Sequence, residues 1–180
     1  HSLPSETRTP QLELFNAIIY TLTLFKTGFT ISIRNFSAEM MPTKLSDFAY
    51  SFVAGNIALQ AATPGSNGVT PYTFTVKYNA AGRVLDALQN KKELPASDTE
   101  ATELKKVVEK AVATVNGKSE YQKAVGLHDY VVSNVAYDED MTPVSFGAYG
   151  ALVKGIASCQ GYMESIGLLY SVAGLGNRMV

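Results

Sequence analysis

The sequence has very few of the residues that build metal sites and disulfides. Its 180 residues include one cysteine, Cys159, and two histidines. One cysteine cannot form an internal disulfide, and one cysteine with two histidines cannot supply a structural zinc site of the usual kind. We therefore predict no metal and no other cofactor. The cysteine count says nothing about the redox compartment.

Charge is also scarce, and neither sign dominates. The chain carries 15 basic and 16 acidic residues, a formal net charge of −1, and only 17% of its residues are charged. Nucleic-acid binding normally leaves a basic excess, so we predict no nucleic-acid partner. The hydrophobic share of 46% is typical of a globular protein with a core.

Long apolar runs are missing as well. The most apolar stretch, residues 12–25, is interrupted by Glu13 and Asn16 and is too short to cross a bilayer. We predict a buried amphipathic helix there and no membrane span. Because the chain starts with His1 rather than Met, we expect a processed protein or a start at an internal boundary.

The first part of the chain, residues 1–95, predicts a small α/β region. Alternating apolar residues predict strands, and helical periodicity with capping signals predicts helices. The predicted strands cover residues 29–34 and 72–78, and the predicted helices cover residues 10–26, 45–53 and 84–89. Tyr72, Phe74 and Tyr78 should form the buried face of the second strand. Residues 62–68 are dense in turn formers and predict a loop.

The second part, residues 96–180, predicts mainly helices. Ser97 and Glu100 have the spacing of a capping box, with Ser97 as the cap of a helix over residues 101–115. The same signal at Ser119 and Gln122 opens a second helix, whose inward residues should be Ala124, Val125, His128, Val131, Val132 and Val135. A loop over 137–147, a brief helix over 148–153 and a helix over 159–173 follow, and residues 177–180 should begin a strand.

Cys159 is the candidate nucleophile of this chain. Ser158 is a natural N-cap, which places Cys159 in a first helical turn, where unpaired N–H groups favour a negatively charged sulfur. The N–H groups of Cys159 and Gln160 could stabilise an oxyanion, and Gly161 would leave room for a substrate. Met163, Leu169 and other apolar residues (Ile166, Tyr170, Ala173) should anchor the helix behind the site. On spacing alone, a lone cysteine is more often a small buried hydrophobe.

Four segments in unbroken order carry a family resemblance. They read HDYVVSN at 128–134, YD at 137–138, AYGALVKG at 148–155 and CQGY at 159–162. Over about residues 121–175 the chain resembles the bacterial transglutaminase-like domain family of the papain-like superfamily. The resemblance implies that Cys159 is the catalytic nucleophile. It also implies a fold that packs the cysteine helix against an antiparallel sheet whose later strands carry a histidine and then an aspartate.

The chain departs from this pattern after the cysteine. Glu164 is the only acidic residue beyond Cys159, and no histidine follows it. We expect residues 96–180 to be the helical front part of a transglutaminase-like core, truncated before the catalytic strands. Another polypeptide could supply the missing strands, or the domain could be non-catalytic. Smaller departures are Ala157, Ser158 and Met163.

Other candidate residues have simpler interpretations. His128 is predicted to pack structurally rather than to act as the base. The acidic run Asp129, Asp138, Glu139 and Asp140 fits no calcium loop and predicts a solvated turn, while Tyr137 with Asp138 could fix the loop that leads to the cysteine. For Tyr149 and Tyr162, a place in a substrate cleft and a place in the core both remain open.

These observations predict an α+β protein and two classes of function. The first is thiol-dependent acyl transfer on peptide or carboxamide substrates, as in a cysteine peptidase, deamidase or transglutaminase. Cys159 would be its nucleophile, with Gln160, Gly161, Tyr149 and Tyr162 as oxyanion and neighbouring candidates. The alternative is a non-catalytic binding or assembly module. Expected partners are a peptide or protein substrate, cell-wall material included, and a second copy in a homodimer or strand-swapped assembly. The expected location is extracellular or at the cell surface.

Overall fold

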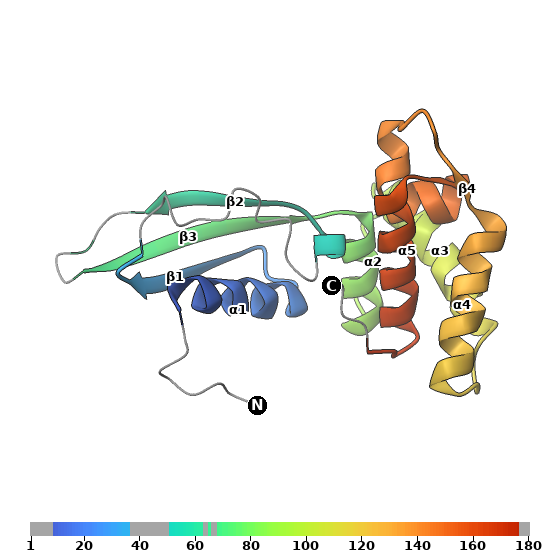
Figure 1. Ribbon diagram of the computed structural model, residues 1–180, viewed down its shortest axis with the longest axis horizontal. Coiled ribbons are helices and arrows are strands. Elements are labelled where there is room, and N and C mark those ends of the chain that lie inside the picture. The colour runs from blue at the N-terminus through green and yellow to red at the C-terminus, as the bar shows by residue number, and fades with distance from the viewer. Residues whose placement is uncertain (1–8, 37–50, 63–64, 66–67, 177–180) are drawn as a thin grey trace. The chain divides into compact units, whose positions relative to one another are not determined.

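The computed structural model describes residues 9–36, 51–62, 65 and 68–176 and has mixed helices and strands, which confirms the α+β class. The chain divides into two compact units, residues 1–77 and 78–180 (Figure 1). The sequence predicted a boundary near residue 95. Helix α2 (Ala80–Gln89) belongs instead to the second unit, because its buried residues, Val84 and Leu85 among them, pack against the later helices.

The first unit places one helix on a three-stranded sheet. Helix α1 (Pro10–Thr23) begins at Thr9, whose hydroxyl accepts a hydrogen bond from the Leu12 N–H at 3.3 Å. The sheet has the order β1 (Gly28–Arg34), β3 (Val69–Tyr78), β2 (Ala54–Ala62). Strands β1 and β3 are antiparallel, with Phe29 opposite Phe74. Leu14, Ile18 and Leu22 of α1 are buried, so this apolar stretch is an amphipathic helix as predicted.

The sequence predicted most of this unit. The expected burial of Tyr72 and Phe74 is confirmed, with exposed fractions of 2% and 0%, whereas Tyr78 is half-buried. Strand β2 was missed because its sequence, AGNIALQAA, has no alternating pattern. Of the helix predicted at 45–53, residues 45–50 lie outside the described residues, and Ser51–Val53 form a single 3-10 turn, η4. The predicted loop at 62–68 lies partly outside them, as does the strand predicted at 177–180.

The second unit is built from helices. Helix α5 (Cys159–Val172) packs against α2, α3 (Thr99–Ala113) and α4 (Glu120–Asn134), as Figure 1 shows. The core of the second unit contains fully buried aliphatic side chains: Leu104, Val108, Leu127, Val131, Leu168 and Leu169. The predicted capping box at Ser119 and Gln122 is present.

The cap predicted for α3 was wrong by one residue. Asp98, not Ser97, accepts the hydrogen bond from the Ala101 N–H, at 3.2 Å. The same carboxylate is held by Arg83 of α2, whose Nε and Nη2 donate to it at 2.6 and 3.0 Å. This ion pair with Arg83 favours Asp98 over the neighbouring serine as the cap.

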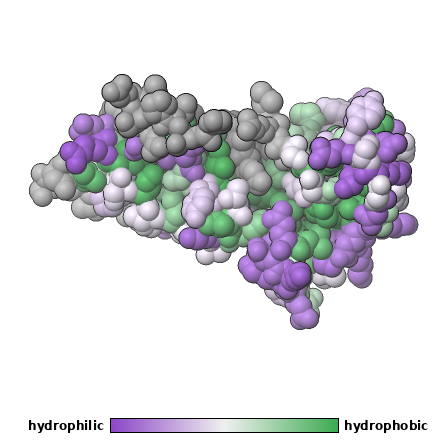
Figure 2. Space-filling view, turned by 90° about the horizontal axis from the view of Figure 1, so that it is seen from below, coloured by the Kyte–Doolittle hydropathy of each residue, from purple (hydrophilic) through white to green (hydrophobic). Residues whose placement is uncertain are grey.

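The inward face predicted for α4 is partly wrong. Leu127, Val131 and Val135 are buried, but Val125 and Val132 are 41% and 56% exposed. Helix α4 turns the stripe of Leu127 and Val131 toward the core, so residues on the neighbouring face meet solvent. On the face drawn in Figure 2, hydrophobic side chains lie between groups of hydrophilic ones. Among the described residues, no helix has the length and apolar character to cross a membrane.

Four short elements join α4 to α5. They are β4 (Ala136–Tyr137), the 3-10 turn η5 (Pro143–Phe146), the π-helical turn η6 (Gly150–Lys154) and β5 (Ile156–Ala157). The sequence predicted a loop and a brief helix here and missed the two strands, which are too short to show a pattern. Strands β4 and β5 pair in parallel and bring the end of α4 beside the residues that precede Cys159.

Candidate functional site

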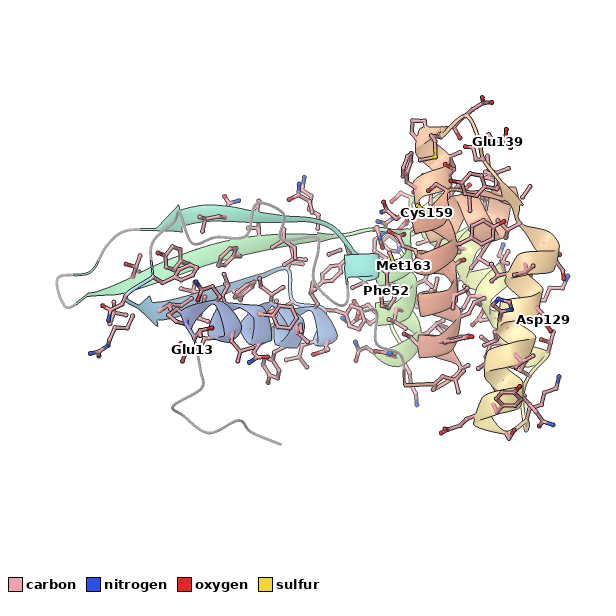
Figure 3. All side chains as sticks on the ribbon, in the orientation of Figure 1. Glu13, Phe52, Asp129, Glu139, Cys159 and Met163 are labelled. Atoms are coloured by element: carbon pink, nitrogen blue, oxygen red, sulfur yellow. The ribbon has the colours of Figure 1, made fainter. Side chains whose placement is uncertain are left out.

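Cys159 is the first residue of α5 and is exposed, so the interpretation as a buried hydrophobe is wrong (Figure 3). Ser158 occupies the N-cap position, as predicted, but its side chain makes no capping hydrogen bond. Its N–H and its hydroxyl both donate to the Ser145 carbonyl, at 2.9 and 3.1 Å. The start of α5 is therefore fixed to the main chain of η5.

Gly161 has a different role from the one predicted. It is buried, and a Cβ at this position would overlap the Ser145 carbonyl oxygen and lie 2.9 Å from the Ala157 Cβ. The missing side chain lets α5 approach η5 closely and does not make space for a substrate. Gly150 also allows close packing on η5, since a Cβ there would overlap the Val144 carbonyl group. Two glycines thus pack on consecutive carbonyl groups of η5.

The side chain of Gln160 points to Glu164, one turn further along α5. Gln160 Nε2 donates to Glu164 Oε1 at 3.0 Å, and the Ala148 N–H donates to Glu164 Oε2 at 3.3 Å. Glu164 is only 5% exposed, and this burial raises its pKa to about 7, although both hydrogen bonds act in the opposite direction. Gln160 itself is exposed, so it connects the surface beside Cys159 with a buried carboxyl group.

Glu164 lines a pocket of about 200 Å³ in the second unit. Residues 79–81 at the start of α2, Glu100 of α3, residues 143–144 and residues 147–149 form the rest of its wall. Cys159 is not part of this wall. The thiol and the Glu164 carboxyl belong to residues five positions apart on one helix, a rise of about 7.5 Å along its axis.

Sequence reasoning missed Glu164 as a site residue. In the sequence, Glu164 stands out only as the one acidic residue after Cys159. A stronger signal was available, because a glutamate four residues after a glutamine lies on the same helical face, in an otherwise apolar helix. The contact with Ala148 comes from a segment 16 residues away and has no signature in the sequence.

The two candidate tyrosines have different surroundings. Tyr149 lines the pocket, its hydroxyl donates to Glu103 Oε2 at 2.7 Å, and the Lys154 ammonium lies 5.1 Å from its ring centroid. The Tyr162 hydroxyl donates to the Val135 carbonyl at 2.6 Å and joins α5 to the end of α4. Tyr149 is thus the one that faces a cavity, and Tyr162 has a packing contact.

His128 lies on α4, away from the pocket. Its side chain is 55% exposed, and its Nδ1 lies 3.2 Å from Asp129 Oδ1. The inward orientation predicted for His128 was therefore wrong. Figure 3 labels Asp129 and Cys159 on different helices, and no hydrogen bond of the described residues joins His128 to Cys159.

The acidic run divides: Glu139 and Asp140 form a turn after Asp138, as predicted, whereas Asp129 lies on helix α4. Asp138 accepts hydrogen bonds from the Thr142 N–H at 2.9 Å and from the Thr142 hydroxyl, and the hydroxyl is the main cause of its lowered pKa. Its own N–H donates to the Ala157 carbonyl at 2.9 Å, so Asp138 ties the turn to the strand that precedes the cysteine. In the described part of the chain, no group of three or more His, Cys, Asp and Glu residues could hold a metal ion.

Comparisons of the chain with protein-family models, with curated proteins and with solved structures found no match. The resemblance to transglutaminase-like domains therefore stays a prediction from the order of four motifs. The site offers an exposed thiol at a helix start and, on the same helix, a buried carboxyl group that titrates near neutral pH.

Proposed function

We propose that this protein carries out thiol-dependent acyl transfer on peptide or carboxamide substrates, as a member of the transglutaminase-like family. The Cys159 sulfur attacks the carbonyl carbon, the C–N bond breaks, and ammonia or an amine leaves with a proton. The resulting thioester passes its acyl group to water or to another amine, which regenerates the thiol. The observation that carries the proposal is an exposed cysteine held as the first residue of a helix by main-chain contacts.

The start of α5 supports this chemistry. The first N–H groups of a helix have no acceptor within it, so they can donate to the oxyanion that forms when a thiolate attacks a carbonyl. The bonds from Ser158 to the Ser145 carbonyl and the close packing of Gly161 hold these donors in place. Donors that are fixed before the reaction stabilise the transition state without further reorganisation.

The proton acceptor for Cys159 has to be a group other than His128, which is exposed on α4 and bonded to Asp129. By the resemblance, a histidine and an aspartate would do this work, and a segment outside residues 9–176 or a second polypeptide would supply them. Peptide or cell-wall substrates and an extracellular or surface location belong to the same proposal.

The position of His128 also favours a second candidate, a non-catalytic binding or assembly module. In that case the described residues would keep the geometry of a thiol site without its base, and Cys159 would not turn over. The two candidates differ in one measurable property, which is whether folding accelerates acylation of the Cys159 sulfur.

The test is acylation of the folded protein by the p-nitrophenyl ester of N-acetylglycine, followed by intact-protein mass spectrometry. We expect a single adduct that forms faster on folded protein than on protein in urea and is absent from Cys159→Ser. Hydroxylamine should then release it as a hydroxamate, and the ratio of hydroxamate to free acid measures transfer against hydrolysis. Acylation of the folded protein that is no faster than in urea would refute the catalytic proposal and leave the binding module.

A further inference from the structure

We propose that the pocket beside Glu164 binds a small organic ammonium ion, such as the protonated end of a short primary amine. This proposal does not depend on the reactivity of Cys159, which does not line the pocket. Three properties of the pocket support it: its charge, its size and the proton equilibrium of its buried carboxyl group.

The charge of the pocket favours a cation. Glu164 and Glu100 are part of its wall, and none of the lining residues is Lys, Arg or His. Arg83, which does not line the pocket, is bonded to Asp98 at 2.6 Å, and its Nη2 lies 4.0 Å from Glu100 Oε2, so it offsets part of the charge of Glu100 and leaves Glu164 as the main anionic group. Of about four acceptor positions on an ionised carboxylate, Glu164 uses one for Gln160 and one for the Ala148 N–H, which leaves capacity for an ammonium donor.

The size and the remaining walls suit a short alkyl chain. Since a water molecule occupies about 30 Å³ in the liquid, a pocket of about 200 Å³ can hold several non-hydrogen atoms. Ala80, Ala81, Pro143 and Val144 supply apolar surface beside the carboxyl group. An n-butylammonium ion matches this combination of one charged end and a small apolar stem.

Binding should be coupled to the protonation of Glu164. Burial raises the pKa of this carboxyl group to about 7, and a cation in the pocket stabilises the ionised form. Affinity should therefore rise between pH 6 and pH 8 and fall tenfold per unit well below the pKa. Glu164 is bonded to the Gln160 amide and the Ala148 N–H, and the titratable groups that share the pocket wall with it are Glu100 and Tyr149.

The experiment is a titration of ¹⁵N-labelled full chain with n-butylamine at pH 8, with n-butanol and butyrate as neutral and anionic probes of similar size. The Ala148 amide is the reporter because it is bonded to Glu164. We expect saturable shifts with the amine alone and binding at least ten times weaker in Glu164→Gln. The readout is an amide shift that needs no turnover at Cys159, which does not line the pocket, so failure of the acyl-transfer proposal would leave this result unchanged.

Gly147→Ala tests the pocket without removing a charge. The backbone at Gly147 is extended (φ −136°, ψ 165°), and a Cβ there would lie 3.4 Å from Glu164 Oε2, so the methyl group fits without strain and fills part of the pocket. We expect weaker amine binding in this variant and no change in Gly176→Ala, where a Cβ meets nothing within 4 Å. Equal binding of butanol or butyrate, or unchanged amine binding in Gly147→Ala, would overturn the proposal even if Glu164→Gln fails to fold.

Discussion

Replacing Gly161 with alanine tests whether the close packing of α5 on η5 holds Cys159 in place. An alanine in a helix interior is about 1 kcal/mol more favourable than a glycine, so helix propensity alone predicts stabilisation. The new Cβ, however, would overlap the Ser145 carbonyl oxygen and lie 2.9 Å from the Ala157 Cβ. Neither atom is the end of a flexible side chain, so the main chain must shift.

Forced overpacking of a core costs about 1–3 kcal/mol. A shift of Ser145 also strains its two hydrogen bonds from Ser158, which contribute about 1 kcal/mol each. Because these costs exceed the gain in propensity, we expect Gly161→Ala to lower the free energy of unfolding by about 2 kcal/mol. In urea, with a slope of about 1–3 kcal/mol per molar, the midpoint should fall by about 1 M.

Far-UV circular dichroism during urea unfolding measures this change, and Gly126→Ala is the matched control on α4. A Cβ at Gly126 would meet the Val115 Cγ1 at 2.9 Å, which is a side-chain methyl group rather than main chain. We expect the control to stay within about 1 kcal/mol of the wild type, since the gain in helix propensity offsets a local adjustment. If Gly161→Ala is as stable as Gly126→Ala, the reasoning about η5 is refuted.

Three further substitutions test the electrostatics and the packing of the second unit. The folded-state pKa of Glu164 is raised from 4.5 to about 7, so the protonated side chain stabilises the fold fully below pH 4.5 and this contribution is lost as pH rises through 7. Relative to Glu164→Gln, the free energy of unfolding in urea should therefore fall by about 3 kcal/mol between pH 4.5 and pH 7.5. Asp98→Ala should lower the free energy of unfolding by about 1–2 kcal/mol at pH 7, mostly because the helix cap is lost. Since the hydrogen bond from Arg83 lowers the pKa of Asp98, this loss should shrink as pH falls through that lowered pKa, and a loss independent of pH would contradict the reasoning. Tyr162→Phe removes the bond to the Val135 carbonyl and should cost about 1 kcal/mol in the same unfolding assay, whereas an unchanged midpoint would mean that water replaces the phenol.

The elements with clear periodicity could be predicted from the sequence, and those defined by distant contacts could not. Strands β1 and β3 and the helices follow alternating or helical patterns, whereas β2 lacks one and was missed. The position of α4 about its own axis depends on what Leu127 meets in the core, so the exposure of His128 could not be read from spacing. Asp98 replaced Ser97 as a cap because Arg83 of another helix binds it.

The candidate site divides in the same way. The place of Cys159 at a helix start follows from local signals, the serine before it and the apolar helix after it. The role of Gly161 does not, because a glycine looks the same whether it admits a substrate or a neighbouring carbonyl. The buried state of Glu164 depends on the segment that contains Ala148, which only the folded chain brings near.

The anchor for the start of α5 is a carbonyl oxygen, a group that every amino acid possesses. An exposed side chain of η5, such as Val144, could therefore be replaced during evolution without displacing the Cys159 thiol. Gly150 and Gly161 have no such freedom, since any side chain there would meet main-chain oxygen. In a diverged copy of this protein, the trace of the site would be the spacing of two glycines around one cysteine, with little else recognisable between them.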